Sequence, residues 1–180
     1  MTRLNLKHAT HKWSVQQFLF LYSIIASLAS CATPATFEGM VPTSFETARK
    51  HPYAVRISIT GGQEDPAVGR PHITDAAFTK ALIESITRSQ VFLQVSQDQT
   101  AKADYLLTVT IFSMDKLVFR RKVTMEAGWT LRRADTGTVV WQESIISEFS
   151  DSNVKLATEG AARNNIAQSL GRISKLNLSR

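Results

Sequence analysis

The sequence predicts an α+β domain: a mainly antiparallel five-stranded sheet with two helices on one face, in the order β-α-β-β-β-β-α, preceded by a signal peptide and a tether. Apolar and polar residues alternate over residues 122–133, which indicates a strand with one buried and one solvated face. Apolar residues at helical spacing over residues 78–86 and 162–173 indicate two helices with one apolar stripe each. A sheet covered on one face by both helices buries all of these surfaces together.

Five segments carry a strand pattern. They are residues 53–59, 91–95, 104–113, 122–133 and 138–149. Between the last two, Asp135-Thr136-Gly137 suits a three-residue hairpin turn with Gly137 in the left-handed conformation. This turn places Leu131 opposite Trp141 and Arg133 opposite Val139, so that Trp129 and Trp141 share the buried face. Both arms are long for strands, and a bulge within them is expected.

The two helices have recognisable ends. Thr74 is a suitable N-cap for the first helix, and Ile73 and Phe78 have the spacing of a hydrophobic staple. A polar break at residues 150–153 precedes the last helix, which is expected to end near Lys175. Gly160 and Gly171 lie inside it and each cost up to about 1 kcal/mol relative to alanine, unless they let the helix lie close to the sheet.

The N-terminus has the organisation of a signal peptide. Residues 1–17 contain Arg3, Lys7 and Lys12 without any acidic residue, and residues 18–29 are uncharged and mostly apolar. A helix of roughly 12 residues spans about 18 Å, which is too short for a hydrocarbon core of about 30 Å. We therefore expect residues 1–30 to be removed rather than to remain as a membrane span.

The single cysteine of the chain, Cys31, directly follows Leu28-Ala29-Ser30. This run resembles the lipobox of bacterial lipoproteins, and the resemblance implies a diacylglyceryl group on the Cys31 thiol and cleavage of the preceding peptide bond. Two or more acyl chains hold a protein stably on a membrane. Ala32 does not resemble the aspartate of an inner-membrane retention signal, so in a Gram-negative host the implied location is the outer membrane, facing the periplasm. Ordinary signal cleavage and an uncleaved anchor are the alternatives.

The domain boundaries follow from composition. Residues 31–52 contain three prolines and no sustained period, which predicts a lipidated flexible tether, and residues 53–180 form the predicted periplasmic α/β domain. Three of the 21 Lys and Arg residues lie within residues 1–30, which contain no Asp or Glu, so the net charge falls from +6 to +3 after cleavage. This small, mixed charge argues against a nucleic-acid partner.

A second resemblance concerns the hairpin. The run from Trp129 to Trp141, W-x-L-x-x-x-x-T-G-x-V-V-W, is similar to small periplasmic lipoprotein domains of the curli-secretion, penicillin-binding-protein-activator and lipopolysaccharide-assembly types. The resemblance does not choose among these families. It implies binding and assembly roles in the cell envelope, without catalysis.

No catalytic or metal motif was found in the sequence. His51 and His72 are the two histidines beyond the signal peptide, and we expect both to be exposed, in the tether and in a loop, without a second ligand at metal-binding spacing. No serine-nucleophile signature is present. The sequence therefore predicts no enzyme, no metal and no cofactor, and an envelope hydrolase with a site built from distant residues remains as an alternative.

Two basic clusters are candidate contacts for an anionic lipid or an acidic partner. Arg120, Arg121 and Lys122 open the longest strand, and Arg132 and Arg133 lie near the hairpin turn. The alternative is that these charges only solvate the strand ends and oppose aggregation.

Three hypotheses of function follow. The first is a membrane-anchored, non-enzymatic module that binds an envelope protein partner in envelope assembly or maintenance, with the long hairpin of residues 122–149 at a sheet edge as one means of pairing with a partner strand. The second is an accessory protein for lipid or lipopolysaccharide transport, with an apolar groove between sheet and helices rimmed by Arg120, Arg121 and Lys122. The third is the envelope hydrolase.

Overall fold

A computed structural model describes residues 34–63, 70–117 and 122–179. Its elements are α2 (Phe37–Met40), β1 (His51–Thr60), α3 (Asp75–Ser89), β2 (Phe92–Ser96), β3 (Tyr105–Leu117), β4 (Lys122–Arg133), β5 (Val139–Ser150) and α4 (Val154–Ile173). The predicted α+β class and the order β-α-β-β-β-β-α are confirmed, with α2 as an additional short helix. The predicted signal peptide, Cys31, Arg120 and Arg121 lie outside the described residues.

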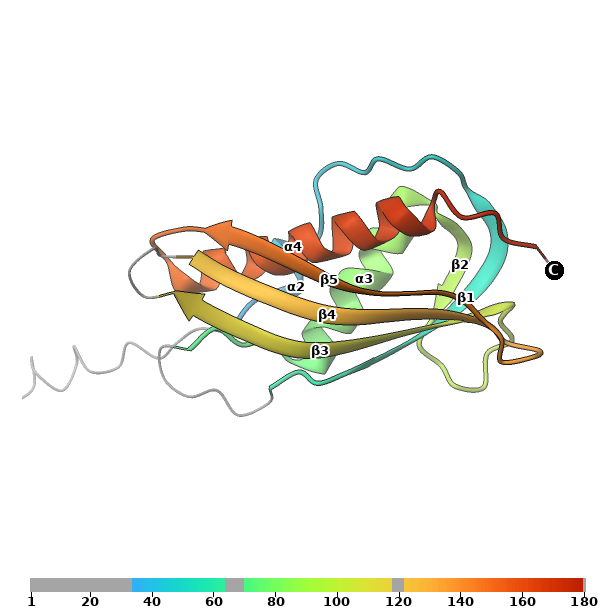
Figure 1. The fold of residues 1–180 in the computed structure, drawn as a ribbon, viewed down its shortest axis with the longest axis horizontal. Helices are drawn as coiled ribbons and strands as arrows, with labels where there is room; N and C mark the ends of the chain where they lie inside the picture. Colours follow the sequence, from blue (N-terminus) through green and yellow to red (C-terminus); the bar gives the residue numbers. More distant parts are fainter. Residues whose placement is uncertain (1–33, 64–69, 118–121, 180) are drawn as a thin grey trace, which may run out of the picture. The chain divides into compact units, whose positions relative to one another are not determined.

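The five strands form one mixed sheet in the order β2-β1-β3-β4-β5. The predicted antiparallel arrangement holds for β3, β4 and β5, whereas β1 pairs in parallel with both β2 and β3. The β1–β2 pair is parallel because α3 is a crossover that returns the chain in the same direction for β2, and the β1–β3 pair is parallel because residues 97–104 return the chain again before β3. Figure 1 shows the helices together on one face of this sheet.

The β4–β5 hairpin confirms most of the predicted register. Leu131 lies opposite Trp141, and Gly137 has a φ of 72° at the turn. Val139, however, lies opposite Arg132 rather than Arg133, because a bulge between Leu131 and Arg132 shifts the pairing by one residue.

Residues 34–50, most of the predicted tether, pack against the domain; we call them the N-terminal strap. Met40 is fully buried and Val41 nearly so. His51, at the end of the predicted tether, is the first residue of β1. The apolar residues of the strap are buried by contacts with α3 and α4. Because the strap is short and mostly irregular, these residues follow neither a helix period nor a strand period that the sequence would show.

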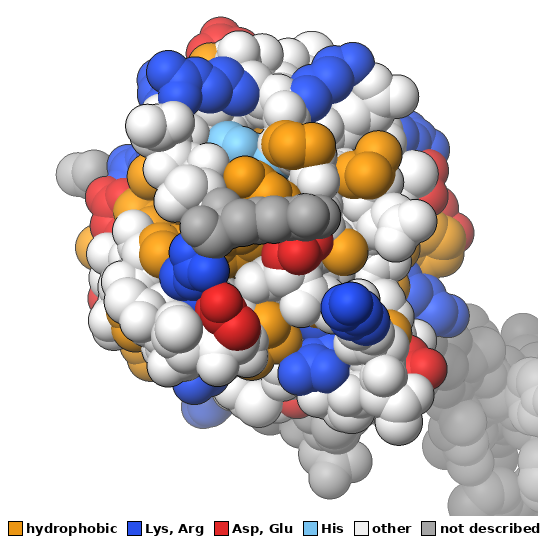
Figure 2. All heavy atoms as spheres, turned by 90° about the vertical axis from the view of Figure 1, so that its right-hand side faces the viewer, with side chains coloured by type: hydrophobic (Ala, Val, Ile, Leu, Met, Phe, Trp, Pro, Cys, Tyr) orange, Lys and Arg blue, Asp and Glu red, His pale blue; other side chains and the backbone are white. Residues whose placement is uncertain are grey.

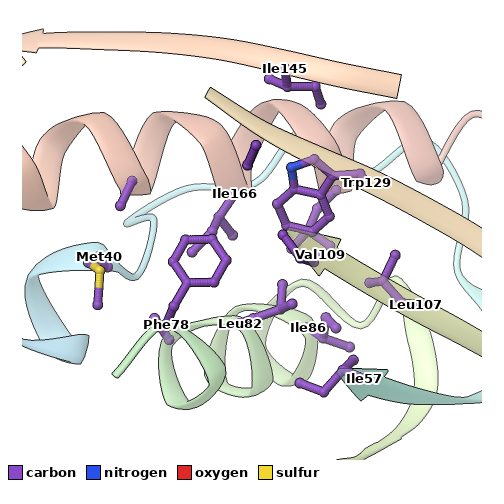
Figure 3. Close-up of a cluster of buried hydrophobic side chains, with 14 of the residues drawn as sticks. Met40, Ile57, Phe78, Leu82, Ile86, Leu107, Val109, Trp129, Ile145 and Ile166 are labelled. Atoms are coloured by element: carbon purple, nitrogen blue, oxygen red, sulfur yellow. The ribbon is translucent and has the colours of Figure 1, made fainter. Parts of the chain in front are cut away.

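The space between sheet and helices is filled by apolar side chains (Figure 3). Phe78 and Leu82 of α3 lie on one side and Trp129 of β4 on the other, all fully buried. The Trp129 indole N–H donates to Asn165 Oδ1 of α4 at 2.9 Å, and Asn165 Nδ2 donates to the carbonyl of Ile145 at 2.8 Å. The buried polar groups are thus paired, which fixes α4 against β4 and β5.

The two glycines of α4 differ in their surroundings. A Cβ on Gly160 would lie 2.2 Å from the ring of Phe149, so Gly160 does let the helix approach the sheet. A Cβ on Gly171 would meet only the Glu46 carbonyl oxygen, at an ordinary 3.8 Å.

Alanine substitutions at the two glycines should therefore have opposite effects. Gly160→Ala should lower the free energy of unfolding by about 1–3 kcal/mol through overpacking against Phe149. Gly171→Ala should raise it by up to about 1 kcal/mol through helix propensity. Urea unfolding followed by circular dichroism measures both, and a larger loss for Gly171→Ala than for Gly160→Ala would contradict this account of the helix packing.

Candidate functional site

The structure separates the basic residues that the sequence predicted as contacts. Lys122 begins β4, whereas Arg132 and Arg133 end it, and the eleven steps of about 3.3 Å from Lys122 to Arg133 span roughly 36 Å. Lys122 forms an ion pair with Glu148 at 2.7 Å. The described members of the two clusters therefore do not form one site.

Arg133 is engaged by the turn and by the C-terminal tail. Its guanidinium donates to both carboxylate oxygens of Asp135, at 3.0 and 2.8 Å, and to the Ser179 carbonyl at 3.1 Å. The hydrogen bond from Arg133 holds the pKa of the Asp135 carboxyl well below its usual range. Arg132 donates to Thr108 Oγ1 at 3.4 Å, and its buried Nε has no hydrogen-bond partner in the described part of the chain.

Among the described residues, the space between sheet and helices is filled where α3 faces β4; Arg120 and Arg121, two rim residues of the hypothesised lipid groove, lie outside these residues. The side chains of Phe78, Leu82 and Trp129 that face one another there have no exposed surface. A fully packed interface of this kind leaves no space for an acyl chain. An apolar stripe has the same sequence pattern whether it meets a ligand or another element of the domain, so the sequence does not distinguish the two.

A groove of about 770 Å³ instead lies along the edge strand β2; we call it the β2 groove. Its walls come from the start of β1, from β2, from the end of α3 and from the loop before β3. The lining residues are Lys50, His51, Pro52, Ala54, Val55, Ile86, Thr87, Gln90, Phe92, Leu93, Gln94, Val95, Ser96, Ala101 and Lys102.

The β2 groove combines apolar surface with positive charge. Leu93 is 72% exposed beside the apolar side chains of Phe92 and Val95. Lys50 and Lys102 line the groove, and no Asp or Glu does so within the described ranges. Lys50 is hydrogen-bonded to Gln90 Oε1. This chemistry suits an anionic amphiphile, whose phosphates pair with ammonium groups and whose chains need apolar contact.

A backbone irregularity lies beside the β2 groove. His51 is paired with Phe92 and Ala54 with Gln94, so β1 has one residue more than β2 between these pairs. Pro52 lies in this bulge and has no N–H to donate to the ladder. The pairing between β1 and β2 is therefore interrupted next to the exposed Leu93.

Both histidines are buried, contrary to the prediction that they are exposed. His51 is 5% and His72 4% exposed. His51 Nε2 lies 3.0 Å from the Ile173 carbonyl, and its ring centroid lies 5.6 Å from that of Phe92. His51 is buried because it begins β1 against the end of α4. In the described part of the chain, no group of three or more His, Cys, Asp or Glu side chains could hold a metal ion.

The outer edge of β5, the predicted place for a partner strand, is partly occupied. Asn165 and Asn164 of α4 donate to the carbonyls of Ile145 and Glu148, at 2.8 and 2.9 Å. Val139 and Val140, near the turn, are exposed. α4 therefore donates to the backbone of β5 within residues 145–148.

Figure 2 shows the end of the molecule that lies on the right in Figure 1. Lys and Arg side chains are distributed around this face, with hydrophobic side chains and a histidine between them. Among the helices that the structure describes, none is long and apolar enough to cross a membrane.

Solved structures share this fold. Protein XCC0632 from Xanthomonas campestris matches with a TM-score of 0.51 and 11% identity, over 79% of this chain and 90% of that protein. The PelC dodecamer from Paraburkholderia phytofirmans matches with a TM-score of 0.51 and 15% identity, over 75% and 96% of the two chains. At such identities the similarity concerns the fold alone. No curated protein matches the sequence.

The class defined by this fold is a small α+β domain with a filled core and a groove at the sheet edge. Residues 55–172 match the model of the lipopolysaccharide-assembly family LptE, which covers more than half of the chain. The protein belongs to this family. This membership supports an accessory role in the cell envelope and agrees with the predicted resemblance to lipoproteins of the lipopolysaccharide-assembly type.

Proposed function

We propose that this protein is a non-enzymatic accessory protein of lipopolysaccharide assembly, anchored through acyl chains on Cys31 to the periplasmic side of the outer membrane. The observation that carries the proposal is the family match over residues 55–172, which extends from β1 into α4. The lipobox-like run before Cys31 supports the anchor. In this role the protein acts together with an envelope protein partner.

Within this role, the β2 groove is the contact for the anionic glycolipid. Lys50 and Lys102 supply two ammonium groups, and Leu93 and the half-buried Val95 supply apolar surface. The absence of carboxylates from the described lining favours a phosphorylated ligand, because no negative side chain there repels it. The ligand therefore binds at the sheet edge rather than beneath the helices, where the core is filled.

Removal of both groove lysines tests this contact. For the double variant Lys50→Ala/Lys102→Ala, binding of purified lipopolysaccharide should weaken about tenfold, since two partly solvated charge-assisted contacts together contribute roughly 1.4 kcal/mol or more. Titration by fluorescence or calorimetry measures the change. The control is Lys116→Ala/Lys175→Ala, which removes the same charge outside the groove. Equal losses in the two double variants would show non-specific attraction and would contradict the assignment of the groove.

The anchor has its own test. Cells that express the wild-type chain should incorporate labelled palmitate into it, and Cys31→Ser should abolish the incorporation because the acceptor sulfur is gone. Ser30→Ala is the matched control, because it keeps a small residue before the cysteine and should be labelled like the wild type. Palmitate incorporation into Cys31→Ser at the wild-type level would refute the anchor.

A further inference from the structure

The N-terminal strap follows α4 along most of its length. Near the start of the strap, the Thr36 backbone N–H and Oγ1 donate to Glu159 Oε1 at 2.8 and 2.9 Å. Further along, Arg163 Nη1 donates to the Gly39 carbonyl at 3.1 Å. At the far end, the Ala48 N–H donates to Ser174 Oγ at 3.0 Å. Strap and helix therefore run in the same direction, with connections at both ends.

The connection at Glu159 is the strongest of these. The Glu159 side chain is 6% exposed, and Lys155 Nζ lies 3.8 Å from its Oε1. A Cβ on Gly39 would lie 2.1 Å from Glu159 Oε2, so the carboxylate reaches the strap only because this residue is glycine. Two strap donors, the Thr36 N–H and Oγ1, thus bond to one charged acceptor, and charge-assisted hydrogen bonds are stronger than neutral ones, which opposes release of the strap.

The strap starts very close to Cys31 in the sequence. Ala35 is already buried at 7% exposure, and four peptide units separate it from Cys31. At 3.8 Å for each Cα–Cα step, covalent geometry limits the distance between the two residues to about 15 Å. A flexible tether of some 20 residues would instead average about 25 Å and leave the domain free to turn.

We infer that one end of the domain rests on the phospholipid leaflet that holds the anchor; we call it the anchor end. It consists of Thr36, the turn at residues 151–153 between β5 and α4, and the first turn of α4. The inference rests on the proposed acylation of Cys31. The β4–β5 turn lies at the opposite end, since the 20 residues of α4 span about 30 Å, and it points away from the membrane.

The side chains of the anchor end fit a lipid headgroup surface. Leu156 is 47% exposed in the first turn of α4, next to Lys155. This first turn contains no acidic residue, and the half-buried Asp151 of the preceding turn accepts from the Asn153 N–H at 2.8 Å. On the neighbouring α3, Lys80 Nζ lies 5.9 Å from the centroid of the half-buried Phe37 ring of the strap. Apolar side chains accompanied by ammonium groups are suited to a surface of phosphates above acyl chains.

The orientation can be measured with fluorescent labels on the full, lipidated chain. Acylation blocks the Cys31 sulfur, so an engineered cysteine is the single free thiol. A bimane label is placed either at the anchor end, in Ser152→Cys, or at the opposite turn, in Thr136→Cys; both positions are exposed. The proteins are reconstituted into vesicles of phosphatidylethanolamine and phosphatidylglycerol that contain lipids with a quencher on the headgroup. We expect strong quenching at position 152 and none at position 136.

Insertion of fifteen Gly and Ser residues after Thr33 is the matched control, because it lengthens the span to the anchor without changing the described domain. Quenching at position 152 should then fall to the level at position 136. Flotation of the vesicles reports the anchor separately. Equal quenching at the two positions in a floating protein, or no effect of the insertion, would overturn the inferred orientation and leave the anchor intact. Failure to float would overturn the anchor, and the orientation with it.

Discussion

The hydrogen bond from the Trp129 indole to Asn165 is the interaction on which the arrangement of the domain depends. It fixes the rotation of α4 over the sheet, because Asn165 also donates to the Ile145 carbonyl of β5. With that rotation set, Gly160 meets the ring of Phe149. The same rotation turns Glu159 and Arg163, which are four residues apart on one face of the helix, toward the strap. One buried polar pair thus determines both how the sheet is covered and how the N-terminal residues are held.

Sequence patterns predicted the elements that have a regular period and a local end signal. The alternation in β4 and the N-cap of α3 are both present, with Thr74 Oγ1 accepting from the Ala77 N–H at 3.1 Å. The parallel pairing of β1 was not predictable, because strand direction is decided by the crossover and not by alternation. The strap was missed for a related reason: Met40 and Val41 are buried by tertiary contacts that leave no local pattern.

The residues of the candidate site likewise could not be predicted from local sequence patterns. Basic residues that stand out in the sequence, such as Arg133, are engaged by nearby carboxylate and carbonyl groups. The lysines of the β2 groove, Lys50 and Lys102, are 52 positions apart and lie in segments without a period. They line one groove because β1 and β2 are neighbours in the sheet and the loop after β2 returns beside them. The ligand that we propose would bind at the sheet edge, where residues distant in the sequence lie side by side.

The strap has a consequence for how the anchored protein we propose would meet its partner. A domain on a loose chain samples many orientations, and complex formation must then restrict them at a cost in rotational entropy. When the strap is held by Glu159 at one end and Ser174 at the other, the orientation of the domain is already restricted on folding, so this entropy is not lost again on complex formation. Encounters within the plane of the bilayer would then begin with the anchor end of the domain already on the leaflet. The effective concentration of correctly oriented domains near a membrane-embedded partner would be higher.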